Sequence, residues 1–413
     1  MAVAAVRPAS ARPRGVSTWP WWVHVLVVHA LARVVSAVIF LVVARTQAAN
    51  PWTPVSPSYL EYTGLMWDAS WYRSIAEGGY PAELPVGAAG ADTQNAWAIF
   101  PLFPATARVL MEVTGGPWQV VAPVLALVLG AAAMLVVHQV VRAGLESVGA
   151  TAGVWSALPL ATVAVLTTSA AAPVLQVGYT ESLALLLLAA TLWCLLRRHL
   201  LAAVPLVVAL GLTRAVALPV TGAVLALAVQ RWRDARDGEA WPTRERLMTA
   251  LLLVVTPVSG LLWPAVCGWV TGDPEAYRST QAAWRGRGAV VPLVPWLDVA
   301  RWWLGGWGPP VLVVLLALAV AAVLSPQMRR LGPVLQAWTA AYLLYLLAVI
   351  EPGTSLLRFL LLAFPLAGVT AALALGSRRP RTWLVVLIVL GVVAQAGWIG
   401  LIWRLVPPSG WPP

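Results

Sequence analysis

Lysine is absent from this sequence, and charge of either sign is scarce. All 27 basic residues are arginines, and charged residues make up 10% of the 413 residues, against 60% hydrophobic residues. Soluble domains carry nearer to 25% charged residues, so a soluble fold is excluded. The apolar residues instead fall in runs of about 20, the length with which a helix crosses the hydrocarbon core of a bilayer. We therefore predict an all-α, polytopic membrane protein that forms a single integral membrane domain over residues 1–413.

Cysteine and histidine are rare too, which argues against thiol chemistry and against a metal site. Cys194 and Cys267 both lie inside apolar runs, which argues against a structural disulfide and against catalytic thiol chemistry. The four histidines are scattered along the chain without the spacing of metal ligands, so no metal site is predicted. The arginines interrupt apolar runs and do not gather on one soluble segment. Nucleic acid is therefore not an expected partner, whereas membrane lipids are.

The arginines also predict the topology. Arginine-rich connections lie in the cytoplasm under the positive-inside rule, and the pattern gives about 11 spans with the N-terminus in the cytoplasm and the C-terminus outside. The run 200–230 is too long for one span and has arginines at both ends, so we predict two short helices that meet near Thr213-Arg214. The other predicted spans are 21–44, 118–141, 152–172, 181–196, 247–270, 309–325, 333–350, 357–376 and 382–403.

Two long connections, 45–117 and 271–308, fall outside the cell in this topology. Long ordered loops are usually functional, so we expect the chemistry at the external face of the cell membrane. The first loop contains the prolines of segment 100–104, which we expect to fold the loop back over the bilayer surface and not to lie in a helix interior. The second loop is interpreted either as a solvated loop of mixed charge or as a surface that stacks acceptor sugars on its tryptophans.

Segment 65–81 of the first external loop is the most informative stretch. It has the pattern of a helix that stops at a pair of glycines followed closely by a proline. Residues four apart share a helix face, so Trp67 and Trp71 are predicted to stack along one stripe, with Asp68 and Tyr72 on the neighbouring one. Such a helix could lie at the membrane interface and present one carboxylate inward. Asp68 is then either a general base or merely a solvated residue of an interfacial helix.

Recognisable motifs favour the first alternative. The segment around Asp68 closely resembles a motif of the PIG-V type mannosyltransferases, and three further segments resemble other motifs of that family in the same order. The C-terminal half matches the family only weakly, in hydropathy and in Leu357-Arg358-Phe359. The four matching segments are Trp67-Asp68-x-x-Trp71-Tyr72-x-x-Ile75-Ala76-x-x-Gly79-Tyr80, 95–104, Tyr179-Thr180-Glu181-Ser182-Leu183 and Leu212-Thr213-Arg214.

The resemblance carries implications about fold and activity. The PIG-V family belongs to the GT-C superfamily of polytopic glycosyltransferases, which use polyprenyl or dolichyl phosphate sugars and invert the anomeric configuration. It implies that Asp68 is the catalytic acidic residue, that the donor is a polyprenyl-phosphate sugar and that the sugar is mannose. The acceptor could be a lipid, a glycan or a protein, and a divalent cation is left open as a cofactor. The alternatives are a GT-C enzyme for a different sugar and a membrane transporter or lipid scramblase.

Several other residues are candidates for substrate binding. Arg214 interrupts an apolar segment, where charge is costly and usually functional, and it is expected to bind the donor phosphate or to pair with Glu181. Glu181 itself could instead be an acidic first-turn residue of a helix capped by Thr180. Arg358 is a second candidate phosphate ligand. The remaining candidates are Trp67, Trp71, Tyr72, Arg73, Tyr179, and Arg33, which either lines the donor groove together with His29 or packs against a polar neighbour.

Overall fold

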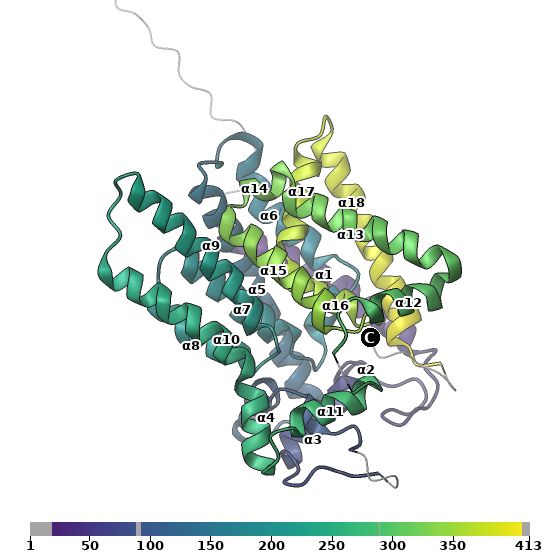
Figure 1. Ribbon diagram of the computed structural model, residues 1–413. Helices are drawn as coiled ribbons and strands as arrows, with labels where there is room; N and C mark the ends of the chain where they lie inside the picture. The colour runs from purple at the N-terminus through teal and green to yellow at the C-terminus, as the bar shows by residue number, and fades with distance from the viewer. Residues whose placement is uncertain (1–18, 88–91, 289, 407–413) are drawn as a thin grey trace, which may run out of the picture.

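The computed structural model describes residues 19–87, 92–288 and 290–406, and these residues are almost entirely helical (Figure 1). Apart from isolated bridge residues at Val86, Asp92 and Val406, the described residues form no β-structure. A helix satisfies all of its backbone hydrogen bonds within one segment, which is what an apolar chain needs in lipid. The prediction of an all-α fold is confirmed.

In chain order the α-helices of the described residues are α1 (Trp21–Ala44), α2 (Tyr59–Gly64), α3 (Asp68–Gly78), α4 (Leu102–Thr114), α5 (Trp118–Ser147), α6 (Leu158–Thr167), α7 (Glu181–Leu196), α8 (Leu200–Gly211), α9 (Ala217–Arg236), α10 (Thr243–Thr271), α11 (Ala276–Arg285), α12 (Val294–Leu304), α13 (Gly308–Leu324), α14 (Pro326–Arg330), α15 (Pro333–Val349), α16 (Leu356–Phe359), α17 (Pro365–Leu375) and α18 (Pro380–Trp398).

Five helical segments in the described part of the chain are long and apolar enough to cross a membrane, which makes this a multi-pass membrane protein. They are α1, α5, α10, the segment Val294–Arg330 and the segment Pro380–Trp403. The predicted span 357–376 is not straight: Leu356–Ala363 and Pro365–Leu375 meet at an angle of 71°. The other predicted spans are short helices, and the N-terminal residues 1–18 lie outside the described residues, so the orientation in the membrane stays a prediction.

The predicted break in the run 200–230 is confirmed. Helix α8 ends at Gly211 and α9 begins at Ala217, which leaves Thr213 and Arg214 in the interruption. Gly211 allows α8 to cross α10 closely, because a Cβ atom at this position would lie 2.2 Å from the carbonyl oxygen of Ser259. Small residues permit such close helix packing in membrane proteins. Close packing of α8 against α10 thus holds the chain in place just before the break.

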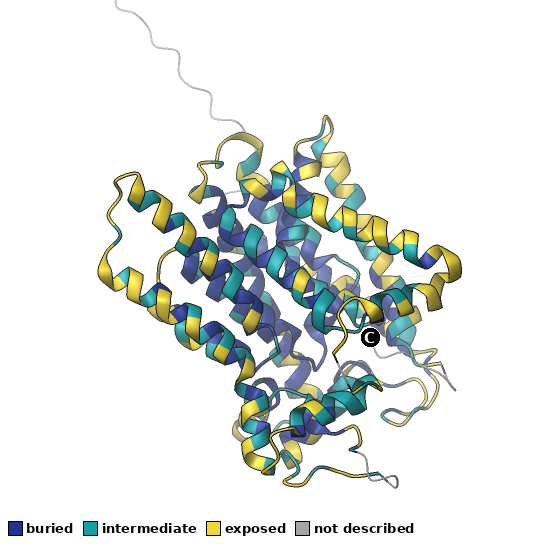
Figure 2. Ribbon diagram, viewed as in Figure 1, coloured by how far each residue is buried: buried dark blue, intermediate teal, exposed yellow. Residues whose placement is uncertain are grey.

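Burial is greatest in the middle of the bundle, along α5 and α7, and lowest along α10, α13 and α18 (Figure 2). In the segment Val294–Arg330, only 6% of the most apolar stretch is buried inside the protein. Exposed apolar side chains are expected where a helix faces lipid, because lipid tails are as apolar as the side chains. The buried centre therefore carries the packing, and the outer helices face the bilayer.

The two predicted external loops contain helices. Helices α2, α3, α4 and α11 gather at one end of the bundle (Figure 1). One local expectation was wrong: helix α3 begins at Asp68, so Trp67 lies outside it. The prolines of segment 100–104 do not lie in a helix interior, as predicted. Pro101 precedes α4, and Pro104 lies in its first turn, where a proline costs no hydrogen bond that the helix would otherwise make.

Candidate active site

Asp68 is the first residue of α3, and a constrained residue places it there. Trp67 has φ 58° and ψ −129°, a rare backbone conformation for a bulky residue, which costs on the order of 1–3 kcal/mol. The Trp67 indole N–H donates a hydrogen bond of 2.7 Å to the carbonyl oxygen of Trp403. The backbone N–H of Asp68 donates to the hydroxyl of Tyr179 over 3.1 Å. Two distant segments thus fix the start of α3 and the direction of its carboxylate.

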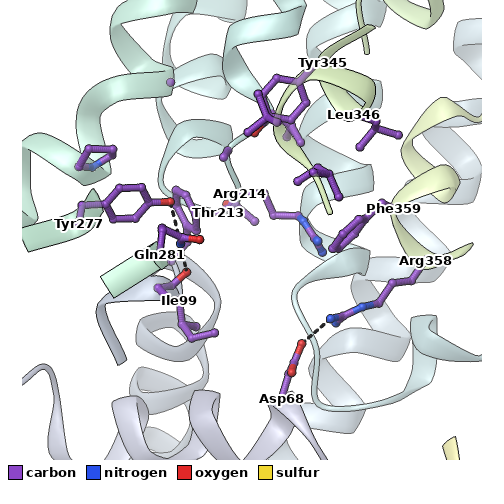
Figure 3. Close-up of a pocket in the computed structure, with 18 of the residues that line it drawn as sticks. Asp68, Ile99, Thr213, Arg214, Tyr277, Gln281, Tyr345, Leu346, Arg358 and Phe359 are labelled. Carbon is purple, nitrogen blue, oxygen red and sulfur yellow. Dashed lines mark hydrogen bonds and ion pairs between the residues drawn. The ribbon is translucent and has the colours of Figure 1, made fainter. Parts of the chain in front are cut away.

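Four charged side chains form a continuous chain of ion pairs, which we call the charge chain: Asp68, Arg358, Glu181 and Arg214. The Arg358 guanidinium lies 2.5 Å from Asp68 Oδ2 and 3.3 Å from Glu181 Oε1. The same Glu181 oxygen accepts a hydrogen bond of 2.5 Å from Arg214. Figure 3 shows the pair of Asp68 and Arg358 at one side of the cavity. Of the two expectations for Arg214, the structure therefore shows the ion pair with Glu181.

The charge chain is deeply buried and balanced. The side chains of Glu181 and Arg358 are 1% and 7% exposed, and those of Arg214 and Asp68 are 16% and 19% exposed. Two carboxylates and two guanidinium groups cancel, as buried ions require, because an unpaired buried charge costs several kcal/mol. Among the described residues, Glu181 Oε2 and Arg358 Nε find no hydrogen-bond partner. The expectation that Thr180 caps α7 was wrong, since its side chain makes no capping bond.

A cavity of about 370 Å³ opens beside the charge chain. It lies between α3, α10, α11, α15, α16 and the break before α9 (Figure 3). At one end Asp68, Arg214 and Arg358 face into it. Another part of its wall is apolar and comes from α10 and α15, with Leu261, Pro264, Leu346 and Val349 among the lining residues. The cavity therefore joins a charged end to an apolar wall that belongs to α10 and α15.

Tyr72 also lines this cavity, on the same face of α3 as Asp68, as the helical spacing predicted. Burial is the largest of the causes that raise the pKa of the Tyr72 hydroxyl above its usual value, and nearby carboxylates add to the rise. The hydroxyl therefore stays protonated around neutral pH. It can donate a hydrogen bond to a ligand in the cavity, but it cannot serve as a base.

The break before α9 positions Arg214. Thr213 donates its hydroxyl to the carbonyl oxygen of Ala209 over 2.7 Å, and the carbonyl oxygen of Leu212 accepts a hydrogen bond of 3.0 Å from the N–H of Leu102. This bond ties the break to the start of α4, in the first external loop. The guanidinium of Arg214 lies 4.6 Å from the ring centroid of Phe359, a cation–π contact. Motifs far apart in the sequence thus meet at one site.

Six of the predicted substrate-binding residues do not line the cavity: Glu181, which lies behind Arg214 and Arg358, Arg33, and the four described here. Trp67 and Tyr179 are buried behind it, where they hold Asp68 in place. Trp71 contacts Trp284 of α11, with ring centroids 5.2 Å apart, so the predicted stripe of Trp67 and Trp71 is wrong. Its physical reason is the positive φ of Trp67, which turns this residue out of the helix. Arg73 is exposed and pairs with Glu77.

Arg33 belongs to a separate cluster inside the bundle. Its guanidinium donates hydrogen bonds to the carbonyl oxygens of Thr167 and Ala172, and His29 Nδ1 lies 2.9 Å from the hydroxyl of Thr167. Arg33 is not among the residues that line the cavity. Of the two expectations for this residue, the structure therefore shows packing against polar neighbours and not a place in the groove beside Asp68.

Sequence reasoning missed one side of the cavity. Tyr277, Gln281 and Arg285 line it from α11, in the second external loop. Their spacing of four residues puts them on one helix face, which is a signal present in the sequence. The segment was interpreted as a solvated loop or as an aromatic surface, so this polar stripe was overlooked.

The residues of the site suit an anion better than a divalent cation. Among the residues with described positions, no group of three or more His, Cys, Asp or Glu side chains could hold a metal ion. Both carboxylates of the charge chain are already paired with arginines. Arginine matches the oxygens of phosphate in geometry and charge. The arrangement can therefore bind a phosphate group beside a carboxylate.

No protein-family model matches the chain, and no curated protein matches it in sequence. Similar solved structures are those of an oligosaccharyltransferase from Archaeoglobus fulgidus. The complex with Zn and sulfate has a TM-score of 0.49 and 14% identity, over 89% of this chain and 53% of that chain. The complex of archaeal AglB with an inhibitory peptide and a dolichol-phosphate has a TM-score of 0.45 and 13% identity, over 93% of this chain and 56% of that chain.

A third structure, of the oligosaccharyltransferase tethered with an acceptor peptide, has a TM-score of 0.47 and 12% identity, over 90% of this chain and 55% of that chain. The chain thus spans about half the length of these proteins. Likenesses this distant assign neither a family nor an activity to it. The resemblance to PIG-V mannosyltransferases stays a prediction.

Proposed function

We propose that this protein is an inverting glycosyltransferase that moves a sugar from a polyprenyl-phosphate donor to an acceptor hydroxyl at the external face of the cell membrane. The observation that carries the proposal is the ion pair of Asp68 and Arg358 in a cavity with an apolar wall. The motif around Asp68 favours mannose as the sugar. The acceptor class is a lipid, a glycan or a protein.

The shape of the cavity suits a lipid-linked donor. Helices α10 and α15 both pack against α9, and the cavity lies between them. Leu261 and Pro264 of α10 and Leu346 and Val349 of α15 offer an apolar surface on which a prenyl chain can pack as it enters from the bilayer. Its phosphate then reaches the end of the cavity that holds Arg214 and Arg358.

The charge chain can couple proton transfer to departure of the phosphate. The acceptor oxygen attacks the anomeric carbon, the bond from this carbon to the phosphate oxygen breaks with its electron pair, and the acceptor proton passes to Asp68. The protonated Asp68 no longer holds Arg358 by charge. The Arg358 guanidinium is thereby released to the prenyl phosphate as this leaving group gains a second negative charge. The total charge of the site stays constant throughout.

The test is transfer of labelled sugar by purified protein in liposomes. Wild type and Asp68→Asn are supplied with radiolabelled polyprenyl-phosphate mannose and a membrane extract of acceptors. Glu77→Gln is the matched control, because it removes an exposed carboxylate from the same helix. Wild type and the control should transfer label, and Asp68→Asn should lose about 10²–10⁴-fold of the rate.

The outcomes separate the alternatives. Transfer that survives Asp68→Asn would remove Asp68 from the mechanism. Transfer from a donor with another sugar, and none from the mannose donor, would keep the enzyme class and change the sugar. Movement of lipid across the vesicle membrane without any glycosyl transfer would favour a transporter or scramblase.

A further inference from the structure

The cavity beside the charge chain is lined by three arginines, and one of them differs from the others. Arg214 and Arg358 are paired with carboxylates, as described above. Arg285 lines the same cavity from the last turn of α11, and within the described residues its side chain makes no hydrogen bond or ion pair. Three acidic residues of this region are bound to other cations: Glu275 pairs with Arg278, and Asp298 and Glu351 pair with Arg287. Asp273, at the opposite end of α11, accepts a hydrogen bond from the backbone N–H of Glu275.

Helix α11 is held so that Arg285 faces the cavity. On its other side Trp284 donates its indole N–H to the carbonyl oxygen of Asn95 over 3.2 Å, and Thr280 lies 3.1 Å from the Asn95 amide. Gln281 and Tyr277 lie one and two turns before Arg285, and both line the cavity with it. A cation in the last turn of a helix is also stabilised by the helix dipole, which replaces part of the missing carboxylate.

The neighbouring polar groups are neutral hydrogen-bonding groups. Gln281 Nε2 lies 3.2 Å from the hydroxyl of Tyr277. Burial raises the pKa of the Tyr277 hydroxyl above its usual value, and the Arg285 guanidinium opposes the rise. The hydroxyl is thus protonated near neutral pH and adds no negative charge. Figure 3 shows Tyr277 and Gln281 on the side of the cavity opposite Asp68 and Arg358, with Arg214 between the two sides.

The charged side chains at the cavity then sum to one positive charge. The four groups of the charge chain sum to zero, and Arg285 adds a single positive charge. A sugar–phosphate–prenyl diester carries one negative charge, which this excess neutralises. A diphosphate-linked donor carries two. Among lipid-linked sugar donors, the balance therefore favours the diester with one phosphate group over the diphosphate.

From these observations we infer that Arg285 is the cation that binds the phosphate of the donor before reaction, while Asp68 still occupies Arg358. Arg358 joins the phosphate only when Asp68 becomes protonated. The inference rests on the proposed function and deepens it, because it divides two roles between two arginines. Arg285 provides affinity for a phosphate monoester or diester, and Arg358 acts at the reaction step.

The test is equilibrium binding to the full-length protein in nanodiscs, with three probes. These are a tritiated polyprenyl monophosphate, the uncharged prenol of the same length and inorganic phosphate. The variants are Arg285→Gln, Arg285→Lys and, as a matched control on the same helix, Arg278→Gln, whose exposed side chain pairs with Glu275 and does not line the cavity. Size-exclusion profiles and thermal unfolding verify that each variant is folded.

Arg285→Gln should weaken binding of the prenyl monophosphate by about 10- to 100-fold and leave binding of the prenol unchanged. Arg285→Lys should retain most of the affinity, and Arg278→Gln should bind like wild type. The inference is overturned if Arg285→Gln binds the prenyl monophosphate as tightly as wild type does, or if it loses affinity for the prenol equally. It is also overturned if inorganic phosphate binds as tightly as the lipid, because the ligand would then be a free anion.

Failure of the inference can be told from failure of the proposed function. If wild type transfers sugar while Arg285→Gln binds the lipid phosphate normally, the function stands and the role of Arg285 is wrong. If binding depends on Arg285 but wild type transfers no sugar from any donor, the phosphate site stands and the enzymatic function is wrong.

Discussion

Arg33 and Arg358 are both buried, and their surroundings differ in one physical respect. The side chain of Arg33 contacts backbone carbonyl groups of Thr167 and Ala172, which have no charge to gain or lose. Arg358 contacts Asp68 and Glu181, which are carboxylates that can be protonated. Burial alone therefore does not distinguish the two arginines. In the proposed mechanism the kind of partner does, because only a titratable partner can release the cation during a reaction.

The two clusters also differ in what they join. Gln395 of α18 donates a hydrogen bond of 3.2 Å to the carbonyl oxygen of Thr167, so the Arg33 cluster connects α1, α6 and α18. It has no place in the cavity. The charge chain connects the external helix α3 with α7, α16 and the break before α9, and it faces the cavity. The first cluster holds the bundle together, and the second brings charges to a site that a ligand can reach.

Among the variants of the two clusters, the largest loss of transfer activity is expected for Arg358→Gln. This change removes the cation that we assign to the departing phosphate, so transfer of labelled sugar should fall by about 10²–10³-fold. The measurement is the initial rate per folded molecule, with folded protein counted by size exclusion. A nearly normal rate of Arg358→Gln would show that Arg358 does not act in the reaction, and the proposed difference between Arg358 and Arg33 would be wrong.

Arg33→Gln should act on stability and not on the reaction. Two buried carbonyl groups lose their charged donor, which should lower the free energy of unfolding by on the order of 3 kcal/mol. Thermal unfolding in detergent measures this loss. The rate of transfer per folded molecule should stay within a few-fold of wild type. A fall as large as that of Arg358→Gln, at a temperature where the variant is folded, would contradict the distinction.

Glu181→Gln sharpens the comparison within the charge chain. The amide keeps the shape of the side chain but removes the charge that holds both Arg214 and Arg358. We expect kcat/KM to fall by about tenfold, because the arginines lose their fixed orientation. In a double-mutant cycle with Arg214→Gln the losses should not add, since the two side chains are in direct contact. Simple addition of the two losses would show that Glu181 does not act through Arg214.

Arg73→Gln should have the smallest effect. Arg73 and Glu77 form an exposed pair, with 44% and 45% of their side chains accessible. Such pairs contribute about 0.5 kcal/mol or less, and activity should be unchanged. An increase of KM for the donor in this variant would restore the sequence-based expectation that Arg73 binds substrate.

Part of this arrangement could be predicted from sequence, because it depends on local signals. The end of α3 at Gly78 follows from its glycine pair, and the break near Arg214 follows from the length of the apolar run. The positive φ of Trp67 could not be predicted, since aromatic residues disfavour that conformation and only tertiary contacts hold it. The pairing of Asp68 with Arg358 could not be predicted either, because it joins segments 290 residues apart.

The cavity wall formed by α11 is an intermediate case. The spacing of Tyr277, Gln281 and Arg285 is visible in the sequence, yet spacing alone does not tell which helix face meets a cavity. That choice is made by contacts of Trp284 with Asn95 and Trp71 in the first loop. Local pattern thus predicts a polar stripe, and long-range packing decides its function.

The coupling between Asp68 and Arg358 is tested most directly by single-turnover transfer from donor already bound to the protein. The rates of Asp68→Asn, Arg358→Gln and the double variant are compared with wild type. Residues that act as one unit lose their effect together, so the double variant should be no slower than the slower single variant. Losses that multiply in the double variant would show that the two side chains act independently, and the proposed release of Arg358 by protonation of Asp68 would be wrong.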